Sequence, residues 1–427
     1  MKKLAKNFLY LFLSDAVSHL LGFIATVYIA RILGIAGFGK ISYGLTFLTY
    51  ALLFGNLGLT TIGAREVAKN GNNLKIISEI LGLRFFLALI IFTCLIAGIL
   101  IIPGDELSKK IIFFYSLTLF PFAVLLEFVF QGREEMEYIG LGRLIQYSVY
   151  VGLLFLLIKN KEKILLIPFA YFISYLVVSV FMMIVFLNKY QEVRLRFNLR
   201  AFSVLIITAL PVGLATLTYQ MAMNFAPLIL GIFHHDVDVG YFSAGYKIVV
   251  FMLILERVAY YLFFPVLSRK SAETPHKLPE TFVAFTQLLL LITVPITIIV
   301  LIIAPILIRV IYGAGYEPSV GIFRLLSLYF MIAPINTIWG YGLVALHQER
   351  EFFKVIGIIS IINFILTSIL GITFKGIGVG LAIFLSEVAG LFLMKSYLGR
   401  YVKFNIGQKI NRAVLREILI LKEPSQR

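Results

Sequence analysis

The chain has few of the residues from which soluble proteins build disulfides, metal sites and charged surfaces. It contains one cysteine, Cys94, among 427 residues, which excludes a disulfide framework. Only 14% of the residues are charged. The motifs His-Glu-x-x-His and Gly-x-Ser-x-Gly do not occur, and no extramembrane segment is long enough for a catalytic domain. We therefore expect no enzymatic activity, no catalytic residue, no bound metal and no cofactor.

A nucleotide-binding motif is also missing, although one segment resembles it. Residues Gly34 to Lys40 spell Gly-x-x-x-x-Gly-Lys, but Ile41 follows where a phosphate-binding loop needs Ser or Thr to hold magnesium. An apolar run precedes the segment instead of a strand. We interpret it as a hairpin between two membrane spans. Any transport by this chain must then be driven by a gradient, by substrate supply or by another protein.

Long apolar runs fill most of the sequence. Hydrophobic residues make up 60% of the chain, and the mean hydropathy is +0.96. Roughly 20 apolar residues cross a bilayer as a helix, and these runs lack the alternation of barrel strands. They predict an all-α polytopic membrane protein with about 12 spans. The predicted spans are 8–30, 41–62, 80–102, 111–131, 143–158, 164–187, 201–232, 241–264, 283–310, 322–346, 353–373 and 377–398.

The net charge of +16 is explained by membrane topology rather than by nucleic acid. When the N-terminus, the even-numbered loops and the tail are placed on one side, that side holds 26 of the 38 Lys and Arg, and the opposite loops hold 10. The basic side of a membrane protein faces the cytoplasm. We therefore expect a multi-pass protein of the cell (plasma) membrane with both termini cytoplasmic, surrounded by membrane lipids and without a nucleic-acid partner.

The chain repeats itself at an offset of about half its length. Residues 32–44 read ILGIAGFGKISYG and residues 229–245 read ILGIFHHDVDVGYFSAG. Both end one span with Ile-Leu-Gly and open the next with Gly, two residues, Ser, one residue and Gly. Six spans separate the copies, and an even number preserves direction across the membrane. We predict two parallel six-helix bundles around a central cavity, at 1–200 and 201–398, followed by a basic cytoplasmic tail at 399–427 that is either a membrane-bound amphipathic helix or solvated.

Polar side chains inside spans are costly, so each is a functional candidate. In the first span Asp15 and His19 are four residues apart on one helix face and could exchange a proton. A local hydrogen bond between helices is the alternative for this pair. Glu127 and Glu387 are the other candidates for ion coupling, and each could instead be paired internally.

Basic residues in and beside the spans are candidates for binding an anionic substrate. Arginine grips phosphate through a planar fork, whereas lysine acts as a point charge. The basic candidates are Arg257, Lys247, Arg65, Arg84 and Arg143. Hydrogen-bonding side chains suit sugar hydroxyls but also hold helices together, and the candidates of this kind are Asn224, Gln220, Asn336 and Asn363. A loop cluster of His234, His235, Asp236 and Asp238 could bind metal, although we interpret it as a solvated loop.

Four segments carry a resemblance to a known family. They are Arg31-Ile-Leu-Gly34 with Gly37-Phe-Gly39, Glu127-Phe-Val-Phe-Gln131-Gly132, Gly240-Tyr-Phe-Ser-Ala-Gly-Tyr246-Lys247, and Gly376-Ile-Gly378 with Ser386-Glu387. In order and spacing the chain resembles the polysaccharide flippases of the multidrug/oligosaccharidyl-lipid/polysaccharide exporter superfamily. It departs from them before Gly231, where Ala226-Pro227 stands in place of a frequent acid, and this weakens any ion site there.

The resemblance implies a transporter that flips a polyprenyl-(pyro)phosphate-linked oligosaccharide from the cytoplasmic to the external leaflet by alternating access. The glycan would serve cell-surface polysaccharide synthesis, and glycan-assembly enzymes are candidate partners. One alternative is a proton- or sodium-coupled drug or cation antiporter of the same fold, which should have an acidic cavity. A membrane-embedded glycosyltransferase or polymerase and a non-transporting scaffold are further alternatives.

Overall fold

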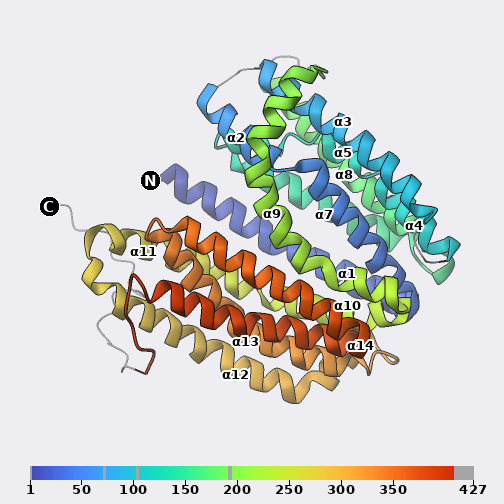
Figure 1. Ribbon diagram of the computed structural model, residues 1–427. Coiled ribbons are helices and arrows are strands. Elements are labelled where there is room, and N and C mark those ends of the chain that lie inside the picture. Colours follow the sequence, from blue (N-terminus) through green and yellow to red (C-terminus); the bar gives the residue numbers. More distant parts are fainter. Residues whose placement is uncertain (1, 71–73, 102–104, 191–194, 408–427) are drawn as a thin grey trace. The chain divides into compact units, whose positions relative to one another are not determined.

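The computed structural model describes residues 2–70, 74–101, 105–190 and 195–407, and no β-strand occurs among them (Figure 1). Nine helices in this part of the chain are long and apolar enough to cross a membrane. The predicted all-α, multi-pass class is therefore confirmed. The number of 12 spans and their grouping into two six-helix bundles stay predictions.

The chain divides into two compact units, Met1–Ser243 and Ala244–Arg427. The boundary lies inside α10 (Asp236–Met252), so the predicted division after residue 200 stays a prediction. The helices that precede α10 are α1 (Lys2–Asn56), α2 (Leu59–Asn70), α3 (Leu74–Ile99), α4 (Glu106–Ser116), α5 (Leu119–Ala123), α6 (Glu127–Gly132), α7 (Met136–Leu157), the short η1 (Lys161–Lys163), α8 (Leu166–Lys189) and α9 (Leu199–Phe233).

The second unit consists of the end of α10 and long helices that pack along one another. They are α11 (Ile254–Glu273), the short η2 (Pro275–Lys277), α12 (Leu278–Tyr312), α13 (Ser319–Ala345) and α14 (Glu349–Leu398). The helix α13 packs against α11, α12 and α14. The core of the second unit contains aromatic residues around the single tryptophan, Trp339, which is 1% exposed.

Two of the longest helices contain a kink where the sequence predicts a loop. In α1 the non-helical residue is Gly34, with φ 69°, and in α14 it is Lys375, with φ 55°. Glycine adopts positive φ readily, whereas lysine does so rarely. Each kink separates two predicted spans, the first from the second and the eleventh from the twelfth.

Two other predicted spans are interrupted. The span predicted at 111–131 consists of three short helices, α4, α5 and α6, with breaks at 117–118 and 124–126. The span predicted at 241–264 has a break at Leu253 and continues to Glu273. Apolar composition alone does not reveal such breaks, because the residues on both sides remain apolar.

The seventh predicted span, at 201–232, contains Pro211 and Pro227, and these prolines predict a tilted or broken helix because proline removes a backbone donor. The structure has one helix, α9, through both positions. It packs against α1, α2 and α3. From residue 408 onwards the predicted basic tail lies outside the described residues.

Candidate functional site

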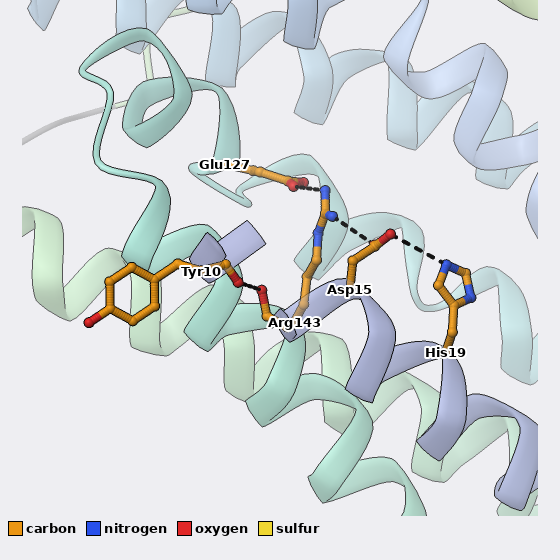
Figure 2. A network of polar contacts seen from close by, with 6 residues as sticks. Tyr10, Asp15, His19, Glu127 and Arg143 are labelled. Atoms are coloured by element: carbon orange, nitrogen blue, oxygen red, sulfur yellow. Dashed lines mark hydrogen bonds and ion pairs between the residues drawn. The ribbon is translucent and has the colours of Figure 1, made fainter. Parts of the chain in front are cut away.

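A chain of charged side chains joins three helices of the first unit. Arg143 on α7 donates to Asp15 on α1, with Nη1 3.2 Å from Oδ1, and to Glu127 on α6, with Nη2 2.8 Å from Oε1. His19, one helical turn beyond Asp15, has its Nε2 3.8 Å from Oδ2 of that carboxyl. Figure 2 shows Arg143 between the two carboxyls, with His19 at the far end. Below, these four residues are called the Arg143 network.

The interruption of the fourth predicted span explains how Glu127 reaches this position. Its side chain belongs to the first turn of α6, immediately after the non-helical residue Leu126. On α1, Asp15 and His19 are four residues apart, and this spacing places both side chains on one face. The shared face expected for these two residues is therefore present, and Arg143 adds the partner from a second helix.

The Arg143 network holds one permanent cation against two carboxylates. The side chains of Arg143, Asp15 and Glu127 are 40%, 21% and 29% exposed, so all three lie partly out of water. Carboxylates and imidazole bind and release protons near or below neutral pH, and carboxylates also bind cations. The Arg143 network therefore contains the groups that a proton or cation site requires.

The second unit has a polar cluster of its own on α11, α13 and α14. Asn336 donates through Nδ2 to Oε1 of Glu387 at 2.7 Å and to the backbone oxygen of Glu387 at 2.9 Å. The neighbouring Thr337 donates its hydroxyl to Glu256. Asn336 is 7% exposed, so its amide serves Glu387. This contact links α13 to α14, and it favours a role for Asn336 in holding helices together.

Lys247 is the predicted cation that the fold leaves without a counter-charge. It lies half-buried on α10, and among the described residues it has neither a hydrogen bond nor an ion pair. Arg257, one helix further along, is exposed and lies within electrostatic reach of Glu256. A half-buried ammonium group without a partner can donate hydrogen bonds to a phosphate oxygen.

The other predicted binding residues are engaged locally. Arg65 is 49% exposed and lies 3.4 Å from Glu66. Asn363 donates to Ser386 at 2.9 Å. Asn224 donates to the backbone oxygen of Gln220 at 2.8 Å, one turn earlier on α9. Their roles in substrate binding stay predictions, and the contacts of Asn363 and Asn224 favour a structural role.

Arg84, which the sequence predicts to bind the anionic substrate, is buried in the protein. It is 2% exposed and donates to two backbone carbonyls, those of Leu125 at 2.9 Å and Phe122 at 2.7 Å. The structure therefore buries this guanidinium among protein atoms. Its substrate-binding role stays a prediction that this placement does not favour.

No group of three or more His, Cys, Asp or Glu that could hold a metal occurs among the described residues. In the loop cluster, Asp236 binds Lys40, with Oδ2 2.8 Å from Nζ. The same Nζ lies 2.6 Å from Asp105. In the sequence Lys40 belongs to the nucleotide-like motif, and no local pattern predicts that it bridges two carboxylates.

The fold resembles those of solved structures of a flippase and a multidrug resistance transporter. The chain aligns with the lipid II flippase MurJ in an inward closed conformation at a TM-score of 0.76, with 16% identity and coverage of 96% of this chain and 91% of that one. It aligns with an inward-facing multidrug resistance MATE family transporter of the MOP superfamily at 0.66, with 13% identity and coverage of 90% and 95%. At these identities the likeness shows the fold alone.

The sequence comparisons show the family. The chain belongs to the polysaccharide biosynthesis protein family, whose sequence profile matches residues 4–271. The profile of the lipid II flippase MurJ family matches residues 245–422. A putative O-antigen transporter of Escherichia coli (strain K12) is 21% identical over 403 residues, which cover 92% of this chain and 96% of the relative. The family resemblance predicted from the sequence is confirmed.

Proposed function

We propose that this protein flips a polyprenyl-(pyro)phosphate-linked oligosaccharide from the cytoplasmic to the external leaflet of the plasma membrane by alternating access. Both termini are cytoplasmic in this proposal, and the chain carries no enzymatic activity. Membership of the polysaccharide biosynthesis family and the likeness to an O-antigen transporter and a lipid II flippase support the substrate class. Enzymes that assemble the glycan are the proposed partners.

The observation that carries the proposal is the free charge on Lys247. A phosphate or pyrophosphate would supply the counter-charge that the described residues do not. Nearby on the same stretch of chain, Arg257 is exposed and adds a second cation. An antiporter for cationic drugs would place acidic rather than basic groups at its binding surface, because opposite charges attract the substrate.

Vesicles containing the purified protein and a fluorescent lipid-linked oligosaccharide test this proposal. We expect the wild type to move the sugar between leaflets, and Lys247→Gln to do so about tenfold more slowly, the effect of losing one charge-assisted hydrogen bond. Lys247→Arg should retain most of the rate. The matched control is Lys354→Gln, because Lys354 is 61% exposed and pairs with Glu351.

Two results would contradict the proposal. One is a wild-type flipping rate in Lys247→Gln protein that is normally inserted. The other is proton- or sodium-driven export of a cationic drug by vesicles that leave the lipid-linked oligosaccharide in place, which would favour the antiporter.

We further propose that the Arg143 network couples this movement to protons or another cation. The joining of two carboxylates and an imidazole through one guanidinium supports this role for Asp15, His19 and Glu127. Glu387 in the second unit is a further candidate, although its bond to Asn336 satisfies one carboxylate oxygen.

A further inference from the structure

Arg84 lies in the core of the first unit, where an arginine has no water to solvate it. It is 2% exposed, and the neighbouring residues Leu125 and Leu126 are 7% and 0% exposed. The carbon Cζ of its guanidinium lies 4.9 Å from the ring centre of Phe122 and 6.0 Å from that of Phe128. A buried charge of this kind persists only where the surroundings compensate it well.

The compensation comes from the interrupted fourth span. A continuous helix would use the carbonyls of Phe122 and Leu125 for its own hydrogen bonds. Here α5 ends at Ala123 and α6 begins at Glu127, and the N–H of Val129 donates to Leu126 at 3.0 Å. The carbonyl of Leu125 accepts from Nη1 of Arg84, and the carbonyl of Phe122, which also accepts the N–H of Leu125 at 3.2 Å, accepts from Nη2. Arg84 thus binds the end of α5 and the break itself.

The break controls where Glu127 points. Glu127 is two residues beyond the carbonyl of Leu125 that Arg84 holds, and it accepts from Arg143 at 2.8 Å. Arg84 also attracts Glu127 electrostatically. If the fourth span closed into a regular helix, the backbone at 124–126 would rotate, and the side chain of Glu127 would lose its contact with Arg143 on α7.

We propose that Arg84 is a positioning residue that holds the fourth span open at 124–126 and thereby directs Glu127 toward Arg143. It does not touch the substrate in this proposal. The inference rests on the proposed function only in that the Arg143 network is its coupling site. Lysine is a poor substitute for arginine here, because its compact ammonium group lacks the fixed fork of donors with which Arg84 reaches both carbonyls.

The test measures the coupling between Glu127 and Arg143 without any transport assay. Thermal unfolding of the purified protein in detergent is followed for Glu127→Gln, Arg143→Gln and the double variant, first with Arg84 and then with Arg84→Lys. With Arg84 present, we expect the double variant to lose clearly less Tm than the two single losses added together. With Arg84→Lys, we expect this non-additivity to fall by about half or more.

Arg133→Lys is the matched control, because Arg133 also lies over aromatic rings, with its Cζ 3.3 Å from the ring centre of Tyr190. It should lower Tm without changing the coupling between Glu127 and Arg143. An unchanged coupling in Arg84→Lys would overturn the inference, because Arg84 would then stabilise the fold without directing Glu127. If Arg84→Lys does not fold, a second variant replaces residues 124–126 by alanine, which favours a continuous helix and closes the break. A coupling between Glu127 and Arg143 that survives this change likewise overturns the inference.

The same variants separate this inference from the proposed function. The inference is supported if the Glu127–Arg143 non-additivity in Tm depends on Arg84. If flipping is at the same time unchanged in Glu127→Gln, the proposed role of the Arg143 network in ion-coupled transport is rejected. If the non-additivity does not depend on Arg84 but flipping requires Glu127, the inference is rejected and the transport role is supported.

Discussion

Gly39 and Gly240 pack against each other's helices in a reciprocal way. A Cβ on Gly39 would overlap the carbonyl oxygen of Asp236, four residues before Gly240, and a Cβ on Gly240 would overlap that of Ile35, four residues before Gly39. The two glycines occupy the same position in the duplicated motif. The two copies of the repeated motif therefore contact each other, and each presents the backbone around the equivalent glycine to the other.

Alanine at Gly39 should disrupt this crossing. The added methyl group has no space between two backbones, and overpacking of this kind costs about 1–3 kcal/mol. We expect a lower Tm for Gly39→Ala and for Gly240→Ala in detergent. Gly152 has nothing within 4 Å of an added Cβ, so Gly152→Ala should be neutral or stabilise by up to about 1 kcal/mol. Equal Tm values for Gly39→Ala and Gly152→Ala would contradict the packing.

Lys40 joins the same crossing to the start of α4. Its side chain is 16% exposed and bridges Asp105 and Asp236. Lys40→Gln leaves two carboxylates facing each other, so we expect a loss of about 1–2 kcal/mol in the free energy of unfolding. The control is Lys110→Gln, which removes an exposed pair with Glu106 and should change Tm little. Lys40→Gln with a wild-type Tm would show that the bridge does not contribute.

The bridge to Asp105 should not respond to mild acid. Partial burial alone would raise the pKa of Asp105, but hydrogen bonds from Lys40 and Ser108 outweigh it and lower that pKa to about 2. A carboxyl with a depressed pKa stabilises the fold above its ordinary pKa, and the effect disappears as the pH falls through the lowered value.

We therefore expect the Tm difference between wild type and Asp105→Asn to stay constant from about pH 8 to pH 5, and to shrink only below about pH 4. Unfolding scans at fixed ionic strength measure it. If the Tm difference disappears already between pH 7 and pH 5, the pKa of Asp105 is not lowered by its contact with Lys40, and the prediction is wrong.

Asp15 is expected to control the pH dependence of transport. Protonation shifts a two-state equilibrium only through its different affinity for the two states, and one pKa unit corresponds to about 1.4 kcal/mol, or roughly a tenfold change in population. Asp15→Asn should flatten the pH–rate profile in vesicles with an imposed pH gradient and leave substrate binding intact. Identical profiles for wild type and Asp15→Asn would reject proton coupling at this site and leave sodium or substrate supply as the driver.

Several features of the chain could be read from local patterns. Apolar run length predicts helices because a spanning segment must satisfy its own backbone. The Gly-x-x-Ser-x-Gly repeat marks two places where small residues allow close approach. Gly44 meets Ile111 on α4, and Gly245 meets Phe323 on α13. The pairing of Asp15 with His19 follows from helical spacing alone.

The sequence by itself determined the helical class, the membrane, the family and the list of costly polar groups, because hydropathy and helical period act over short stretches of chain. Only the tertiary structure decided which polar groups meet. It placed Arg143 with Asp15 and Glu127, buried Arg84 against two carbonyls at the interruption of a span, and bridged Lys40 to two carboxylates. It also left Lys247 without a counter-charge from the part of the chain that the structure describes. Such pairings join residues as many as 196 positions apart, and no local pattern contains them, because they depend on where separate helices cross.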